Sequence, residues 1–206
     1  MLRKPSGEDA LEIATRMNKV NGETNLAAIA ALGIADRDRV LEIGPGNGKF
    51  ACSIIDSAEN VSYVGIDWSQ EMVDAASQLN AVLVRSGQAL FKVGTSSQIP
   101  FGNGEFTKVI SVHTLYFWDD SRSHLREIKR VLKPDGLLCL CFGDQSFMER
   151  LPFTEFGFQL YTKEKAEKYL ADCGFTVIKA LTHQETGQSN TGASVEKSIN
   201  ILVCAP

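Results

Sequence analysis

The segment from Val40 to Phe50 restricts the fold of this chain more than any other. It reads VLEIGPGNGKF, so an apolar run leads into three glycines at alternate positions. The run predicts a short buried strand over 39–43, and a helix is expected to begin near Phe50. Glycine adopts positive φ and lets a ligand approach the main chain, so the loop can turn sharply. A strand, a glycine loop and a helix in this order bind nucleotide-like ligands at the strand ends of open α/β sheets.

The spacing of the glycines separates two kinds of ligand. A dinucleotide fingerprint, G-x-G-x-x-G, would need a glycine where this chain has Lys49. The chain instead places Glu42 before Gly44, Gly46 and Gly48. A purely structural turn is the alternative, because a short glycine motif is weak evidence by itself.

The composition of the whole chain narrows the class of protein. With 206 residues the chain fits a single domain over 1–206, and a net charge of −4 disfavours a nucleic-acid partner. We expect no membrane span and no signal peptide, because no apolar run is long enough. The five cysteines form no C-x-x-C pair, which predicts reduced thiols in a cytoplasmic protein. Cys139 and Cys141 lack partner ligands, so no metal site is predicted.

The order of apolar and polar segments predicts alternating strands and helices. It indicates an α/β fold: a Rossmann-like, seven-stranded, mostly parallel sheet with an antiparallel last strand and helices on both faces. A polar loop is expected over 185–193, and the helix over 122–132 is expected to place His124 at the surface. The expected strands cover 39–43, 61–67, 90–94, 106–112, 137–142, 175–181 and 196–204. The other expected helices cover 8–20, 24–32, 50–58, 70–79 and 161–170.

Two segments outside this alternation have open interpretations. The two helices within 1–35 could form a lid over the glycine loop or only cover a sheet edge. The segment 143–160 is a candidate acceptor-site insertion, and it is rich in phenylalanine. Such an apolar stretch would suit a small, partly apolar ligand, but it could equally be core or a dimer contact. A monomer and a homodimer therefore both remain open.

Asp67 ends the second expected strand about twenty residues after the glycines, where an acid commonly binds ribose hydroxyls. A carboxylate suits that role because it only accepts hydrogen bonds. The alternative is that Asp67 caps the helix beginning near Gln70. Both roles can hold together.

Several motifs occur in an order that resembles the class I S-adenosylmethionine-dependent methyltransferases of the small-molecule, UbiE-like type. The resemblance runs from about Met17 to the final strand. The motifs are the Glu42 glycine loop, Gly65-Ile66-Asp67, Gly94 to Phe101, Arg130 to Gly136, and Gly174-Phe175.

The resemblance implies S-adenosyl-L-methionine as cofactor, with S-adenosyl-L-homocysteine as product. The three glycines would line its methionine part, Glu42 would lie near its amino group, and Asp67 would bind the ribose. Many relatives have an acid where this chain has Thr95, so backbone contacts to adenine are expected there. The residues expected to bind the cofactor are Glu42, Gly44, Pro45, Gly46, Asn47, Gly48, Asp67, Trp68, Ser69, Met72, Gly94, Thr95, Ser96 and His113.

Methyl transfer from a sulfonium needs mainly proximity and alignment, and a base only for a hydroxyl or protonated amine. His113 and Tyr116 are the candidate catalytic residues, without a decision between them. His113 could contact the cofactor, act as a base, or satisfy a carbonyl at the strand end. Tyr116, Phe117 and Trp118 could wall the acceptor pocket or pack a helix onto the sheet. His183 is not expected to face the substrate.

The function expected from these observations is methyl transfer to a small-molecule acceptor. Two alternatives belong to different classes. One is a non-catalytic protein that binds S-adenosylmethionine or a partner, which the missing acid at Thr95 leaves open. The other is an NAD(P)-dependent oxidoreductase, which Lys49 and the antiparallel last strand disfavour.

Overall fold

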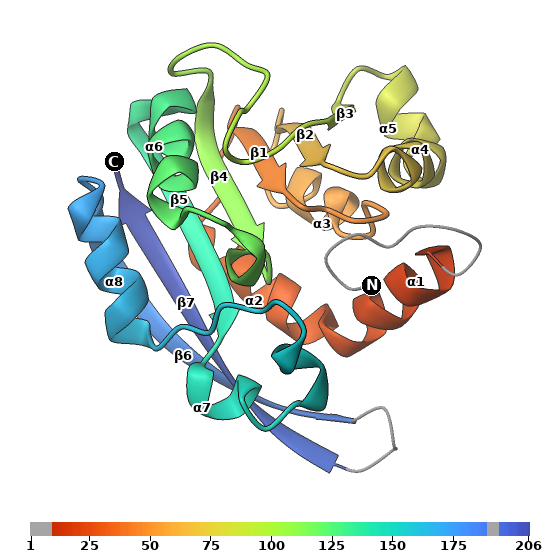
Figure 1. Cartoon of the computed structure of the whole chain (residues 1–206). Helices are drawn as coiled ribbons and strands as arrows, with labels where there is room; N and C mark the ends of the chain where they lie inside the picture. The colour runs from red at the N-terminus through yellow and green to blue at the C-terminus, as the bar shows by residue number, and fades with distance from the viewer. Residues whose placement is uncertain (1–9, 189–193) are drawn as a thin grey trace.

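The computed structural model describes residues 10–188 and 194–206, and it contains one seven-stranded sheet in the order β3-β2-β1-β4-β5-β7-β6 (Figure 1). Strands β1 to β5 pair in parallel, whereas β7 is antiparallel to both β5 and β6. The predicted fold is therefore confirmed. The strands are β1 Arg39–Ile43, β2 Ser62–Asp67, β3 Ala89–Val93, β4 Phe106–Val112, β5 Leu132–Gly143, β6 Thr176–Gln188 and β7 Ser194–Ala205.

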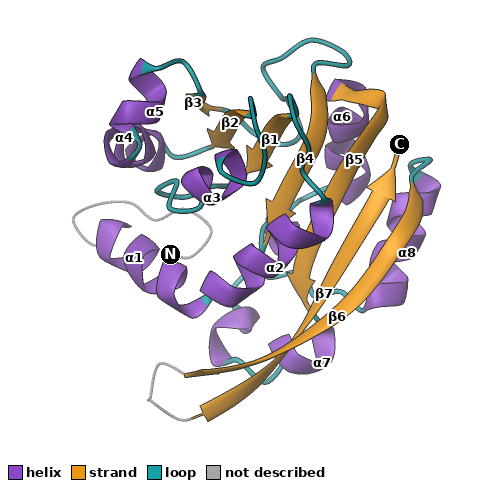
Figure 2. Cartoon of the chain, turned by 180° about the vertical axis from the view of Figure 1, so that it is seen from behind, coloured by secondary structure: helices purple, strands orange, loops and turns teal. Residues whose placement is uncertain are grey.

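Helices cover both faces of the sheet. In the half formed by β5, β6 and β7, α6 and α8 lie on one face and α2 lies on the other (Figures 1 and 2). The helices are α1 Ala10–Val20, α2 Gly22–Leu32, α3 Ala51–Ile55, α4 Gln70–Leu79, α5 Ala81–Arg85, α6 Ser121–Val131, α7 Gln145–Met148 and α8 Lys163–Asp172. Two 3₁₀ turns, Leu115–Phe117 and Pro152–Glu155, complete the helical elements of the described chain.

The strand order reverses between β1 and β4, which are neighbours at the centre of the sheet. Chains leave adjacent parallel strands in opposite directions at such a point, and this opens a crevice beyond their carboxyl ends. Central strands of this kind are buried on both faces, so most of their residues are apolar. Val40 and Leu41 on β1 and Val109 on β4 are fully buried. The core therefore fixes the two strand ends that flank the crevice.

The structure corrects the predicted end of β6. The loop predicted over 185–193 is wrong in its first part, because β6 continues to Gln188 and pairs with β7. Glu185 lies opposite Lys197 in this pairing, and both side chains are buried as an ion pair. Charged residues in a sequence suggest an exposed segment, but a carboxylate paired with an ammonium can lie in the interior. Residues 189–193 lie outside the described part.

Smaller corrections concern element boundaries. Helix α2 begins at Gly22, earlier than predicted, and α3 ends at Ile55. The cap of α6 is Asp120, whose side chain accepts a hydrogen bond from the Arg122 N–H. Strand β5 begins at Leu132 because this residue pairs with β4 before a register shift. The first residues of the helix predicted over 8–20 lie outside the described residues.

Two further expectations concern the state of the cysteines and membrane-spanning segments. All five cysteines are free thiols, and four of them are buried. Within residues 10–188 and 194–206, no helix combines the length and the apolar character needed to cross a membrane.

Candidate functional site

The glycine loop leaves β1 after Ile43 in a conformation that side chains disfavour. Gly44, Gly46 and Gly48 all have left-handed backbones, with φ of 72°, 55° and 69°. A Cβ on Gly44 would lie 2.6 Å from Thr114 Cγ2, beyond the end of β4. The loop therefore approaches the neighbouring strand end closely, and its main chain faces the crevice without side chains. A ligand can lie against this bare backbone.

Asp67 connects the end of β2 to the glycine loop. Its Oδ2 accepts a hydrogen bond from the Gly46 N–H at 3.2 Å, and its Oδ1 accepts one from the Ser69 N–H at 3.0 Å. Burial raises the pKa of Asp67, and these N–H donors oppose the rise. Ser69 is the cap residue of α4, so the carboxylate bonds the cap rather than serving as the cap. Each carboxylate oxygen has a second lone pair that can accept from a hydroxyl.

Glu42 is buried within the sheet, facing a tyrosine that sequence reasoning missed. Its Oε2 accepts a hydrogen bond of 2.6 Å from the Tyr63 hydroxyl on β2. Burial is the largest cause that raises the pKa of Glu42 to about 7, the Tyr63 bond lowers it, and the charge of Asp67 raises it. A carboxyl group in this state becomes ionised readily when a cation, such as an ammonium group, lies nearby.

Helix α1 covers the glycine loop and α4. Asn18 Nδ2 donates to Asn47 Oδ1 at 2.8 Å, which ties α1 to the loop. Ala14 packs on Met72, and both side chains are buried. Trp68, four residues before Met72 in the chain, is 38% exposed. This arrangement is what a lid would require, although the lid itself stays a prediction.

The loop after β3 packs against α6 through a buried serine. Thr95 is exposed, and its hydroxyl lies 3.2 Å from the Ser97 hydroxyl. Ser96 is buried, and its hydroxyl is 2.7 Å from His124 Nδ1. His124 in turn stacks on Trp118, with ring centroids 5.1 Å apart. The prediction of a surface His124 is therefore wrong, and Trp118 has the packing role.

The sequence did contain a signal for the burial of His124. Ser121, His124, Leu125 and Ile128 recur at the spacing of one helix face, and all four are buried. The charged residues between them obscured this stripe. A histidine on the apolar stripe of a helix should be expected inside.

His113 follows β4 at the crevice, and its backbone is unusual. Its φ is 57°, a left-handed conformation that few residues other than glycine adopt, and its N–H donates to the Cys141 carbonyl at 2.9 Å. Nδ1 lies 3.0 Å from the Tyr116 hydroxyl, which also accepts a hydrogen bond from the Gly143 N–H. Nε2 is buried and has no hydrogen-bond partner among the described residues.

The electrostatics of His113 follow from its burial. Desolvation is the largest cause that lowers the pKa of His113 to about 4, and the nearby Lys197 ammonium lowers it further, while Glu185 raises it. The imidazole is therefore neutral at physiological pH. A neutral ring with an unpaired buried nitrogen can bind one further polar atom.

The segment 143–160 contributes aromatic rings next to Tyr116. Phe158 packs on Tyr116, Phe117 and Phe153, with ring centroids 5.7, 4.7 and 5.6 Å apart. The Gln159 N–H donates to the Tyr116 carbonyl at 3.0 Å and holds the segment in place. These rings form an apolar wall beside His113.

A buried polar group on β6 and β7 lies near enough to His113 to affect its pKa. Glu185 Oε1 accepts from Lys197 Nζ at 2.5 Å, and His183 Nε2 lies 3.5 Å from Glu185 Oε2. Burial alone would raise the pKa of Glu185, but the hydrogen bond and charge of Lys197 outweigh it and lower the pKa. His183 is partly buried beside this pair.

These residues fit an S-adenosylmethionine molecule chemically. The bare loop can accommodate an amino-acid chain, Asp67 has free lone pairs for hydroxyls, and Glu42 can ionise beside an ammonium group. His113 Nε2 is an unsatisfied polar atom in the same crevice.

Comparisons with known proteins agree on one family. Residues 41–140 match the family described as Methyltransferase domain. The putative methyltransferase YrhH of Bacillus subtilis is 35% identical over 128 residues, which are 62% of this chain and 70% of that protein. The O-methyltransferase resE of Aspergillus sclerotiorum is 30% identical over 66% of this chain, but that match spans only 49% of the resE protein.

A solved structure shows the same fold. A SAM-dependent methyltransferase from Methanosarcina mazei superposes with a TM-score of 0.68 at 21% identity, and the match covers 85% of this chain and 95% of that one.

The glycine loop yields a prediction about stability. A Cβ on Gly48 would lie within 2.9 Å of Asn80, Ala76 and Phe91, whereas one on Gly46 meets nothing within 4 Å. Gly46→Ala should cost about 1 kcal/mol from backbone strain alone. Gly48→Ala should cost about 2–4 kcal/mol, because overpacking adds to that strain. Urea unfolding of the two variants without ligand measures the difference, and equal losses would contradict this packing.

Glu42 yields a prediction about pH. Its pKa is raised from 4.5 to about 7 on folding, so between these values the folded state binds more protons than the unfolded state. Stability of the wild type should therefore fall as pH rises through this window. Glu42→Gln does not titrate, so its stability relative to wild type should increase across the same window. Thermal unfolding below and above the window tests this, and a constant difference would refute it.

Proposed function

The chain belongs to the class I S-adenosylmethionine-dependent methyltransferases, and from this we propose that it transfers a methyl group from S-adenosylmethionine to a small-molecule acceptor by in-line displacement. One observation carries the proposal. The left-handed glycine loop, the Asp67 carboxylate and the unpaired Nε2 of His113 all lie at the carboxyl ends of the neighbouring strands β1, β2 and β4. A ligand binds at such a topological switch point in open α/β sheets.

Each of the proposed cofactor-binding residues would contact a different part of the ligand. Gly44, Gly46 and Gly48 would lie along the methionine part, with Glu42 close to its ammonium group. Asp67 would accept hydrogen bonds from the ribose hydroxyls, and Met72 would give the adenine an apolar neighbour. Bound S-adenosylmethionine would supply a methyl group already activated by its sulfonium charge. The protein then contributes mainly alignment and exclusion of water.

His113 is proposed to act as a hydrogen-bond donor. The Tyr116 oxygen already accepts from the Gly143 N–H, and its own hydrogen is used when the Tyr116 hydroxyl donates to His113 Nδ1. The imidazole hydrogen then lies on Nε2, which faces no acceptor in the described protein. An oxygen of the cofactor or of the acceptor would satisfy it. Tyr116 is a positioning residue in this scheme, because it acts through the histidine.

The acceptor is proposed to bind next to both the aromatic wall and His113. Rings of Tyr116, Phe153 and Phe158 would exclude water from one side, and aromatic faces attract a cation such as the sulfonium. This surface favours a small, partly apolar acceptor. The segment 143–160 would then be the acceptor-site insertion, and α1 the lid.

Calorimetric binding tests the cofactor assignment. S-adenosylmethionine and S-adenosylhomocysteine should bind to the wild type, and NADH should not. Asp67→Ala should weaken binding by about 1–3 kcal/mol, because a buried acceptor for hydroxyls is lost. Glu59→Ala, which removes an exposed acid, is the matched control. Preference for NADH, or unchanged affinity in Asp67→Ala, would contradict the assignment.

Methyl transfer to a panel of small molecules tests the proposed activity and His113. His113→Asn should lower kcat at least about tenfold with little change in thermal stability, because Asn tolerates the left-handed backbone but is too short to replace Nε2. Tyr116→Phe should give a smaller loss, because it leaves the imidazole in place. Full specific activity in His113→Asn would exclude the proposed role. A protein that binds the cofactor but methylates no panel member would support the non-catalytic alternative.

A further inference from the structure

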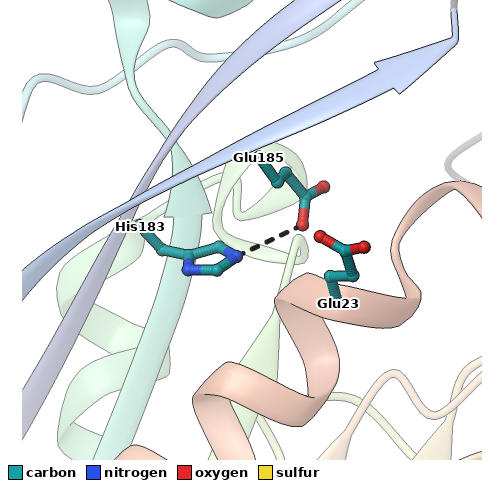
Figure 3. Close-up of side chains that lie close together, drawn as sticks. All are labelled: Glu23, His183 and Glu185. Carbon is teal, nitrogen blue, oxygen red and sulfur yellow. Dashed lines mark ion pairs between the residues drawn. The ribbon is translucent and has the colours of Figure 1, made fainter.

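Three side chains from two distant parts of the chain converge beside the proposed acceptor space. Glu23 extends from the first turn of α2, and His183 and Glu185 extend from β6 toward it (Figure 3). One ligand atom from each residue, a ring nitrogen or a carboxylate oxygen, lies within 4.8 Å of the other two. The sequence analysis predicted no metal site, because these residues are about 160 positions apart and form no local motif.

The polar atoms of this group are not satisfied by the protein. Glu185 is 7% exposed, and its Oε1 accepts from Lys197, whereas its Oε2 makes no hydrogen bond of good geometry among the described residues. The buried Thr24 hydroxyl lies close enough to help lower the pKa of Glu185, and it is itself without a partner of good geometry in the same residues. His183 Nε2 is also buried and has no hydrogen-bond partner within the same residues; it lies at an ion-pair distance of 3.5 Å from Oε2 of Glu185 (Figure 3). A buried polar atom left without a partner costs free energy, so such atoms commonly mark a ligand. The free lone pairs here point into one space.

We propose that Glu23, His183 and Glu185 bind a divalent transition metal ion such as Zn²⁺. One imidazole nitrogen with two carboxylate oxygens suits zinc, manganese or iron, whereas magnesium and calcium take oxygen ligands. Metal–ligand distances of about 2.0–2.2 Å place ligand atoms up to about 4 Å apart, so the group needs a small closure. Glu23 is exposed and can rotate to supply it.

Lys197 supports this site rather than blocking it. Its ammonium donates to Oε1 of Glu185 and to the Val20 carbonyl at the end of α1, so the contact that it makes with the carboxylate leaves Oε2 available for a metal ion. Partners of this kind orient a ligating carboxylate. The two carboxylates and the ammonium together carry one negative charge. A divalent ion would leave one positive charge, which favours an anionic oxygen as a further ligand.

The position of Glu23, His183 and Glu185 in the fold indicates that the methyl acceptor supplies this anionic oxygen ligand. This part of the inference rests on the proposed function. Gly143 on β5 pairs with Ile199 on β7, which pairs with His183 on β6. The Gly143 N–H also donates to the Tyr116 hydroxyl, which contacts His113. Gly143, Ile199 and His183 are thus opposite one another on three adjacent strands, and this register links the metal site to the proposed methyl-transfer site. A metal ion at this site would suit an acceptor that is a small molecule with an ionised oxygen, such as a phenolate or enolate.

Calorimetric titration with zinc chloride tests the metal site directly. The protein is prepared without a polyhistidine tag and stripped with a chelator. The wild type should bind one equivalent, and Co²⁺ at the same site should give a visible absorption band. Glu23→Gln and His183→Asn should each weaken binding at least about tenfold. Both leave the Glu185–Lys197 pair intact, so folding should be preserved. Glu196→Gln, which removes an exposed acid from the same hairpin, is the control and should bind normally.

Two outcomes would overturn the metal site. One is the absence of zinc binding in the folded wild type. The other is binding that is unchanged in Glu23→Gln and His183→Asn, as expected if thiols such as the exposed Cys52 hold the ion. Zinc binding does not depend on S-adenosylmethionine, so failure of methyl transfer with normal zinc binding would count against the proposed function alone.

Discussion

The hydrogen bond between the Gly46 N–H and the Asp67 carboxylate is the interaction on which the site depends. It joins the loop after β1 to the end of β2, the strand that pairs with β1. The loop can reach the carboxylate only because its glycines adopt left-handed backbones. This bond holds the bare main chain of the loop and the Asp67 carboxylate, a hydrogen-bond acceptor, together at the carboxyl ends of β1 and β2. The remaining site residues are arranged around that pair, with α1 above it and the end of β4 beside it.

The sequence predicted what local physics determines. The glycine loop, the position of Asp67 and the alternation of strands and helices along the chain follow from φ requirements and apolar periodicity, which a short segment expresses by itself. Pairings across the sheet could not be predicted in this way. Tyr63 bonds to Glu42 across neighbouring strands, and Lys197 pairs with Glu185 across a hairpin. Both involve polar side chains that become interior only once the strands are assembled, so the polar segment at the end of β6 was mistaken for a loop.

The crevice combines two contrasting surfaces around His113. Phenylalanine rings from 143–160 form an apolar wall, while β6 and α2 contribute unpaired polar atoms. Apolar walls exclude water and strengthen electrostatic interactions within the site. The left-handed backbone of His113 costs energy that only the surrounding contacts offset, and strained residues of this kind concentrate at functional sites. The proposed acceptor, which is small and mostly apolar with one oxygen held by polar groups, would contact both surfaces.

A crystal structure with S-adenosylhomocysteine bound tests the central claim most directly. The account predicts the amino-acid part of the ligand against residues 44–48, both ribose hydroxyls on the Asp67 carboxylate, and the sulfur facing the space beside His113. A ligand bound elsewhere, or an Asp67 carboxylate turned away from the ribose, would contradict it.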